Sequence, residues 1–232
     1  MIIDAQRLSK RFGRTQALTD VTLSVYPGTV YGLLGSNGAG KSTSLSILLG
    51  LLRPDSGVVR LFGTDWQRES LARVGASVNG PSFYGHLSAR KNLRVHANLI
   101  GAGEHDIDRA LHLAGLTQVA DRRAGRYSTG MKTRLATAIA LLGDPELVVL
   151  DEPQNGLDPE GIRYMRDLMR TIAAEGRTVL FSSHVLTEVA ATAHHIGCIV
   201  AGRTVFQGTL ADFAPDGNIE RAYFDRCAAV TV

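Results

Sequence analysis

The alternation of hydrophobic and polar positions along the chain predicts a series of short strands. Residues 21–25 alternate apolar and polar side chains, and the Pro-Gly pair at 27–28 ends that strand. Residues 30–34 and 147–150 are continuous apolar runs, which are typical of strands buried in a parallel sheet. Further strands are expected near 74–78, at 178–182, and as a pair at 196–200 and 203–207 around a turn at 201–202.

Between the strands, apolar residues recur with helical spacing. Helices are expected at 42–52, stopped by Pro54, at 159–174, at 187–193 and from Ile219 near the C-terminus. Residues 87–131 have helical periodicity and no strand-like run, so we interpret them as a mostly helical sub-domain inserted into an α/β core. Strands that alternate with helices indicate a largely parallel sheet covered on both faces.

Composition fits one large domain with a sizeable core. The chain has 232 residues, of which 44% are hydrophobic. We expect a single domain over 1–232, with the α/β core at 1–86 and 132–232. The helical insert at 87–131 interrupts this core, and a short tail follows at 215–232.

Charge and cysteine content indicate which partners and which cellular compartment to expect. The formal net charge is +3 and Lys and Arg are scattered, so we expect no nucleic-acid partner. Cys198 and Cys227 have no metal-ligand spacing, which fits a reducing cytosol. We see no secretory signal, and no apolar stretch approaches the roughly 20 residues of a membrane span. Any role at a membrane is therefore expected to act through a partner.

The strongest chemical signal is GSNGAGKS at residues 35–42, which matches the G-x-x-x-x-G-K-[ST] pattern of a phosphate loop. Its glycines let the backbone curl so that N–H groups point at phosphate oxygens, and the following helix N-terminus favours an anion. Lys41 would charge-pair with the β and γ phosphates, and Ser42 would offer a hydroxyl to Mg²⁺. We assign the nucleotide contacts to Ser36, Asn37, Gly38, Ala39, Gly40, Lys41, Ser42 and Thr43.

A second candidate lies where the apolar strand at 147–150 ends in two acids. Ligands bind at the carboxyl ends of strands in open α/β sheets. We expect Asp151 to hold Mg²⁺ through water and Glu152 to act as general base on the attacking water. The alternative is that the acids merely end the strand, and the phosphate loop makes this less favoured.

The segment Tyr-Ser-Thr-Gly-Met at 127–131 precedes a helix pattern at 132–142. Ser128 is a natural N-cap, so local chemistry alone favours a plain helix start. In chain order, however, the phosphate loop, this segment, Asp-Glu-Pro at 151–153, Asn-Gly-Leu-Asp at 155–158 and Ser-Ser-His at 182–184 resemble the ATP-binding subunit of ABC transporters. The resemblance runs from residue 2 to about residue 210, and it is strongest to exporters of antibiotics and peptide antibiotics.

The resemblance implies a P-loop NTPase (RecA-like) core with a mainly parallel sheet, an N-terminal antiparallel β part and an inserted helical sub-domain. It also implies a head-to-tail dimer with two ATP molecules at the interface. Ser128 and Gly130 would close over the γ-phosphate held by the other subunit, which Asp158 would contact. His184 would reach the γ-phosphate; the alternative is a surface histidine without a function. Phe12 would stack on adenine; the alternative is an ordinary core Phe.

The chain departs from the family pattern at a few positions. Asn79 stands where the family usually has Gln, a catalytic residue and Mg²⁺ ligand, and it is one methylene shorter. Gln154 replaces a small residue such as Thr or Ala, and Thr129 and Met131 replace the commonest signature residues.

Aromatic residues follow Asn79 at the junction with the helical insert. The resemblance places Phe83, Tyr84 and His86 in a groove that receives a helix of the membrane subunit, and exposed aromatics are good anchors at such a contact. Packing of the junction itself is the alternative.

The resemblance implies an ATPase motor with ATP and Mg²⁺ as cofactors, bound to an integral membrane permease subunit and to a second ATP-binding subunit. It would act at the cytoplasmic face of the cell membrane and export an antibiotic, peptide or other hydrophobic compound. One alternative is a non-transport ABC ATPase acting in DNA repair or translation, although the long inserts of those relatives do not fit in 232 residues. Another is a regulatory nucleotide-binding module without turnover.

Overall fold

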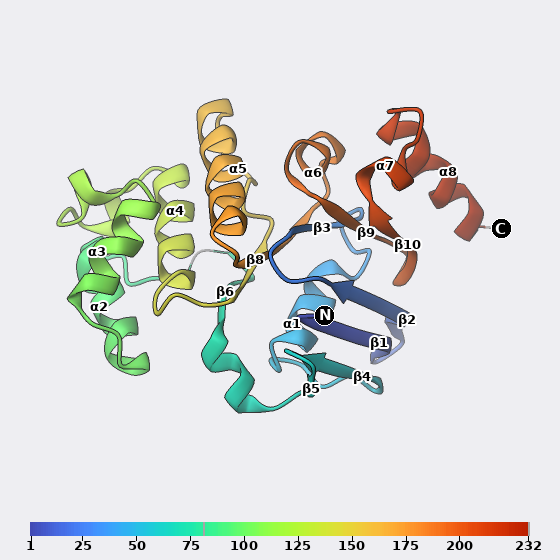
Figure 1. The fold of residues 1–232 in the computed structure, drawn as a ribbon, viewed down its shortest axis with the longest axis horizontal. Helices are drawn as coiled ribbons and strands as arrows, with labels where there is room; N and C mark the ends of the chain where they lie inside the picture. The colour runs from blue at the N-terminus through green and yellow to red at the C-terminus, as the bar shows by residue number, and fades with distance from the viewer. Residues whose placement is uncertain (81, 232) are drawn as a thin grey trace.

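The structure, a computed structural model, describes residues 1–80 and 82–231. It contains two β-sheets (Figure 1). The larger sheet has the strand order β10-β9-β3-β8-β7-β6, in which only the pair β9–β10 is antiparallel. The smaller sheet is antiparallel, with the order β2-β1-β4-β5. The expected mainly parallel core and N-terminal antiparallel part are both confirmed.

The elements have the following bounds. The larger sheet contains β3 (Val30–Leu34), β6 (Val74–Ser77), β7 (Leu147–Asp151), β8 (Thr178–Ser183), β9 (His195–Val200) and β10 (Arg203–Thr209). The smaller sheet contains β1 (Ile3–Phe12), β2 (Thr15–Val25), β4 (Ser56–Leu61) and β5 (Thr64–Asp65). The α-helices are α1 (Lys41–Leu48), α2 (Ala89–Ile100), α3 (Glu104–Leu113), α4 (Thr129–Ala140), α5 (Pro159–Ala174), α6 (Leu186–Thr192), α7 (Leu210–Phe213) and α8 (Ile219–Thr231). Short 3₁₀ helices lie at Arg68–Arg73, Thr117–Val119 and Ala124–Arg126.

The continuous apolar run of β3 is explained by cover on both faces of the sheet. Tyr31 and Leu33 belong to a hydrophobic cluster with residues of α1, β1 and β2. Val30 and Leu34 belong to a second cluster with residues of α5 and α6. Because alternate side chains of a strand point to opposite faces, every residue of β3 is buried.

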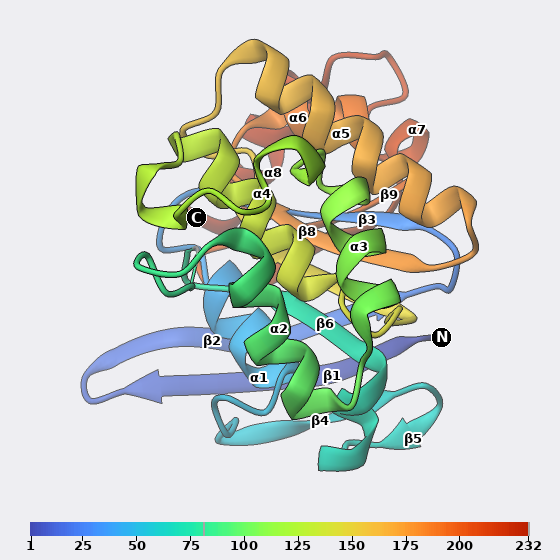
Figure 2. The same cartoon turned by 90° about the vertical axis from the view of Figure 1, so that its left-hand side faces the viewer.

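Helices α2, α3 and α4 lie beside one another at one end of the molecule (Figures 1 and 2). They share a third hydrophobic cluster, to which they contribute the fully buried Leu93, Leu111 and Leu135. Helix α4 also packs on β6, the edge strand of the larger sheet. The inserted helical part is therefore present, while its proposed limits at 87–131 stay a prediction.

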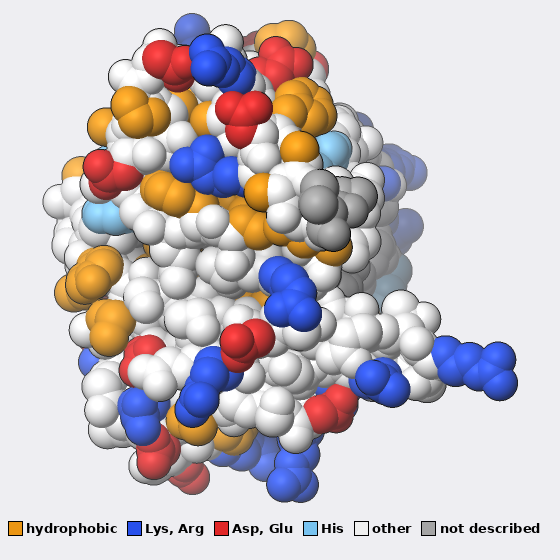
Figure 3. Space-filling view, turned by 90° about the vertical axis from the view of Figure 1, so that its right-hand side faces the viewer, with side chains coloured by type: hydrophobic (Ala, Val, Ile, Leu, Met, Phe, Trp, Pro, Cys, Tyr) orange, Lys and Arg blue, Asp and Glu red, His pale blue; other side chains and the backbone are white. Residues whose placement is uncertain are grey.

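The C-terminal helix α8 lies at the opposite end of the molecule (Figure 1). On this side, hydrophobic side chains are interspersed with acidic and basic ones (Figure 3). Among the helices of residues 1–80 and 82–231, none has both the length and the hydropathy needed to cross a bilayer.

The helix predicted at 42–52 is shorter than expected. Helix α1 begins at Lys41 and ends at Leu48, well before Pro54. Gly50 has a φ of +67°, and a left-handed glycine just after the last turn ends a helix. A Cβ at Gly50 would lie 2.1 Å from Cζ2 of Trp66, so the tryptophan ring packs against this helix end.

We expect Gly75→Ala to destabilise the protein. The added Cβ would lie 1.7 Å from the carbonyl oxygen of Ala140, so α4 would have to move away from β6. Overpacking of this kind costs about 1–3 kcal/mol of unfolding free energy. Gly85→Ala is the control, because its Cβ would meet no atom closer than 3.6 Å. Urea unfolding measures both variants, and equal midpoints would contradict a close contact between α4 and β6.

Candidate active site

The loop between β3 and α1 packs closely against neighbouring residues, with no space for a side chain at two of its glycines. A Cβ at Gly35 would lie 2.4 Å from the carbonyl oxygen of Ile199, and one at Gly40 would lie 2.5 Å from Cδ2 of Leu18. Gly40 also has a φ of +108°, a conformation that side chains with a Cβ rarely adopt. Gly35 and Gly40 are therefore required because a side chain would not fit at either position, and Gly40 also because of its backbone conformation.

The Lys41 ammonium lies inside this loop. Its side chain is 5% exposed, and Nζ donates to the carbonyl oxygens of Gly35 at 2.8 Å and Ser36 at 3.2 Å. Nζ also forms an ion pair with Oε1 of Glu152 at 3.1 Å. The lysine thus links the phosphate loop to the acids at the end of β7.

Strand order places Asp151 beside the start of α1. Oγ of Ser42 donates to Oδ1 of Asp151 at 3.2 Å, and Oγ of Ser182 donates to the same oxygen at 2.6 Å. The Ser182 hydroxyl in turn accepts a bond of 2.9 Å from the backbone N–H of Glu152. Asp151 and Ser182 are paired in the parallel register of β7 and β8, so one serine orients both acids.

The Glu152 carboxylate lies between the side chains of Lys41 and His184. Its Oε2 lies 2.9 Å from Nδ1 of His184, on the opposite carboxylate oxygen from Lys41. Glu152 also has a φ of +50°, which is strained for a residue with a side chain. Strain of this kind persists where the surroundings impose it, and it concentrates at functional sites.

Two residues near this carboxylate were not assigned to the site from the sequence. Ser182 was part of the quoted Ser-Ser-His segment, but its bridging role depends on the register of β7 and β8. Glu188 of α6 accepts a bond of 3.3 Å from Oγ of Ser183. Burial raises the pKa of Glu188, the bond from Ser183 lowers it, and the nearby Glu152 raises it again. The sequence carried no signal for Glu188 beyond its position four residues after His184.

Asn79 follows β6 with a φ of +60°. Its neighbours Ser77 and Gly80 line a cavity of about 290 Å³ together with Asp151 and Glu152. The structure therefore places the Asn79 segment next to the two acids, while the contacts predicted for its amide stay a prediction.

Gln154 lies in the turn after Glu152. Its side chain is only 3% exposed, and within the described part of the chain neither amide atom has a hydrogen-bond partner. An unsatisfied buried amide costs about 1–3 kcal/mol. The structure offers no compensating contact for this departure from the family pattern.

Ser128 and Asp158 both begin helices. The Ser128 hydroxyl accepts from the N–H of Met131 at 3.3 Å, and the Asp158 carboxylate accepts from the N–H of Gly161 at 2.9 Å. Gly130 faces the Leu157 side chain, which a Cβ would approach to 3.6 Å. Within residues 1–80 and 82–231, no hydrogen bond joins Ser128 to the phosphate loop. The two helix starts therefore lie together, and Thr129, next to Ser128, lines the same cavity as Asp151 and Glu152.

Phe12 is not a core residue. It ends β1 with 49% of its surface exposed, and Nζ of Lys10 lies 5.9 Å from its ring centroid. This exposure rules out the alternative of an ordinary core Phe and leaves the ring free to stack on a ligand.

The donor set near the loop suits a hard cation. The Ser42 hydroxyl and the Asp151 carboxylate supply oxygen ligands, as Mg²⁺ prefers. The described residues contain no cluster of three or more His, Cys, Asp or Glu side chains that could hold a metal alone. A cation here would need further oxygens from water or phosphate, which is how Mg²⁺ is bound at nucleotide sites.

Comparisons with known proteins agree with this geometry. The family model "ABC transporter" matches residues 18–155. The bacitracin transport ATP-binding protein BcrA of Bacillus licheniformis is 42% identical over 207 residues, covering 87% of this chain and 68% of BcrA. The lantibiotic transport ATP-binding protein SrtF of Streptococcus pyogenes is 39% identical over 206 residues, covering 89% of this chain and 90% of SrtF.

Among solved structures, an ATP-binding subunit of an ABC transporter superposes with a TM-score of 0.85 at 26% identity, over 97% of this chain and 99% of that one. None of these relatives favours a non-transport ATPase acting in DNA repair or translation. The chain belongs to the ABC transporter family, as its ATP-binding and ATP-hydrolysing subunit.

Proposed function

We propose that this subunit powers the export of a peptide antibiotic or another hydrophobic compound through an integral membrane permease, at the cytoplasmic face of the cell membrane. The cargo class is supported by the similarity to BcrA and SrtF, which are transport proteins for bacitracin and a lantibiotic. The observation that carries the motor function is the position of Glu152, 3.1 Å from Lys41 and 2.9 Å from His184.

The loop at residues 35–42 binds the phosphates of ATP in this proposal. Its backbone curls around the Lys41 ammonium, which donates to the carbonyl oxygen of Gly35 and pairs with the carboxylate of Glu152. The γ-phosphate of ATP competes with Glu152 for this ammonium, so substrate binding releases the carboxylate. The exposed Phe12 ring stacks on the adenine.

Glu152 then acts as general base on the attacking water. Its carboxylate accepts the proton while His184 keeps it oriented through the 2.9 Å contact. Ser182 fixes the backbone of Glu152 and the carboxylate of Asp151 at the same time. Ser42, Asp151 and Asn79 would hold Mg²⁺, which would neutralise charge on the phosphates.

A second copy of the chain completes each site. Ser128 and Gly130 lie at the N-terminus of α4, which favours an anion, yet they are not bonded to the phosphate loop of their own chain. A head-to-tail dimer brings this helix end to the γ-phosphate held by the partner. Asp158, next to Leu157, would contact that partner.

The permease is expected to bind near α2. At the N-terminal end of this helix, Tyr84 is 51% exposed, whereas Phe83 packs against the helical cluster. At its other end, Leu99 and Ile100 are 79% and 58% exposed. These two side chains line a cavity of about 510 Å³ that reaches Gly75 of β6. Exposed apolar side chains beside such a hollow suit a helix of the membrane subunit.

Glu152→Gln is expected to reduce ATP hydrolysis by about 10²–10⁴-fold while ATP binding persists, because only the general base is removed. The chain is tagged, purified from membranes with its permease, and assayed for phosphate release. Glu69→Gln, a change of the same kind at an exposed position, is the control and should keep full activity. Hydrolysis that persists in Glu152→Gln would contradict the assigned base, and the absence of any membrane protein in the purified complex would contradict the transporter assignment.

Mixing two inactive variants tests the shared site. Lys41→Ala removes the phosphate contact and Ser128→Arg blocks the helix end, so each variant alone damages both sites of a homodimer. In a mixed dimer, both changes fall in one site and the other site is intact. Co-expression should therefore restore measurable hydrolysis above either variant alone. No recovery, with dimers verified by differential tags, would argue against contributions in trans.

A further inference from the structure

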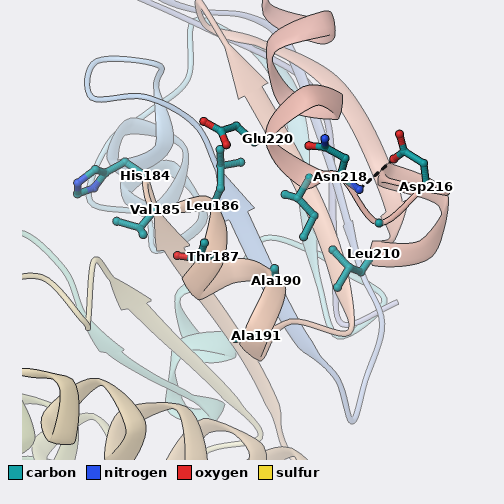
Figure 4. A pocket seen from close by; sticks show the side chains of 12 residues that line it. His184, Val185, Leu186, Thr187, Ala190, Ala191, Leu210, Asp216, Asn218 and Glu220 are labelled. Atoms are coloured by element: carbon teal, nitrogen blue, oxygen red, sulfur yellow. Dashed lines mark hydrogen bonds between the residues drawn. The ribbon is translucent and has the colours of Figure 1, made fainter.

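A two-residue turn carries His184 between β8 and α6. Strand β8 ends at Ser183 and helix α6 begins at Leu186, so His184 and Val185 alone connect them. Figure 4 shows His184 directly before α6, where it borders a cavity of about 1010 Å³ that also reaches the beginning of α8. The imidazole therefore has room to turn away from Glu152, and its position depends on how firmly this turn is held.

One end of the turn is fixed to the phosphate loop. Ser183 is paired with Leu34 in the parallel register of β3 and β8. Its carbonyl oxygen accepts a bond of 3.3 Å from the backbone N–H of Gly35, the first residue of the loop at 35–42. Ser183 is also buried, so it has little freedom to move. The residue before His184 is thus tied to the loop that binds phosphate.

The other end of the turn is fixed by Glu188. The Ser183 hydroxyl accepts a bond of 3.0 Å from the N–H of Val185 and donates one of 3.3 Å to Oε2 of Glu188. The N–H of Glu188 donates to the carbonyl oxygen of Val185 at 3.2 Å. These three bonds form a closed ring across the turn, and the His184 backbone lies within the segment that the ring encloses.

An acid in the first turn of a helix also has a simpler explanation, because it stabilises the helix dipole. A carboxylate with that role alone can point into water. Glu188 is instead half-buried and bonded to the Ser183 hydroxyl, back toward the end of β8. Val185, the N-cap residue of α6, has no polar side chain, so Ser183 and Glu188 supply side-chain hydrogen bonds at this helix start.

We propose that Glu188 is a positioning residue for His184. Through Ser183 it holds the turn from which Nδ1 of His184 reaches Oε2 of Glu152 at 2.9 Å. The proposal rests on the roles given to Glu152 and His184 in the proposed function. It adds a residue of α6, one helical turn beyond the histidine, to those on which hydrolysis depends.

Glu188→Ala tests the proposal in the purified permease complex. Loss of one hydrogen bond should lower kcat by about 2- to 10-fold. KM for ATP should stay the same, because the loop at 35–42 and its lysine are unchanged. Glu220→Ala is the matched control, since it makes the same substitution at an exposed acid that lines the same cavity (Figure 4). The control should keep the kcat of the unmodified chain.

Glu188→Gln separates the hydrogen bond from the charge. The amide oxygen of Gln can accept from the Ser183 hydroxyl as the carboxylate does, so kcat should return to within about 2-fold of the unmodified value. This variant also removes the risk that Glu188→Ala fails to fold. A Gln variant as slow as Glu188→Ala would overturn the proposal, because the bond to Ser183 would then not be what matters.

The His184→Ala background separates positioning of the histidine from a general effect on the fold. In that background, Glu188→Ala should cause no further loss in single-turnover hydrolysis, since the ring that it positions is gone. A loss by the same factor in both backgrounds, an unchanged kcat in Glu188→Ala, or an equal loss in Glu220→Ala would each overturn the proposal. Full activity of Glu152→Gln would instead contradict the proposed function.

Discussion

The site depends on one buried charge, the Lys41 ammonium. At 5% exposure it has lost nearly all contact with water, and the carbonyl oxygens of Gly35 and Ser36 and the carboxylate of Glu152 replace that hydration. Hydrogen bonds to a charged group contribute about 1.5–3 kcal/mol each, and a buried charge without partners is very costly. The curl of the loop, the end of β7 and the position of Glu152 are therefore fixed relative to one another by the same ammonium.

The topology of the larger sheet makes this arrangement possible. β3, β8 and β7 are adjacent and parallel, so their carboxyl ends deliver the phosphate loop, Ser182 with His184, and Asp151 with Glu152 to one edge. Residues far apart in the sequence meet there because parallel strands require crossover helices. On the other side of β3, β9 places Cys198 beside Leu34, and α8 packs against the hydrophobic cluster that contains both residues. Gly35 of the phosphate loop contacts both neighbours of β3: its N–H donates to the carbonyl oxygen of Ser183 in β8, and its Cα lies close to the carbonyl oxygen of Ile199 in β9.

Much of this could be predicted from local sequence, since the apolar runs of β3 and β7, the glycine spacing of the loop and the Ser128 cap each reflect a short-range constraint. What the sequence did not predict depends on distant contacts. The early end of α1 requires Trp66 packing at Gly50, and the bridge through Ser182 requires the register of β7 with β8. The expected contacts of Asn79, Ser128 and Asp158 with nucleotide or partner remain predictions, because they involve groups outside a single chain.

The central claim is that Glu152 and His184 act as one unit around the substrate, and a double-mutant cycle on single-turnover hydrolysis tests it most directly. Groups that act as a unit give grossly non-additive losses. Hydrolysis of ATP in one turnover would be compared among Glu152→Gln, His184→Ala and the double variant. The structure predicts that the double variant is no slower than the slower single variant, because the 2.9 Å contact makes each residue useful only with the other. Losses that multiply would contradict it and would show that the two residues contribute independently.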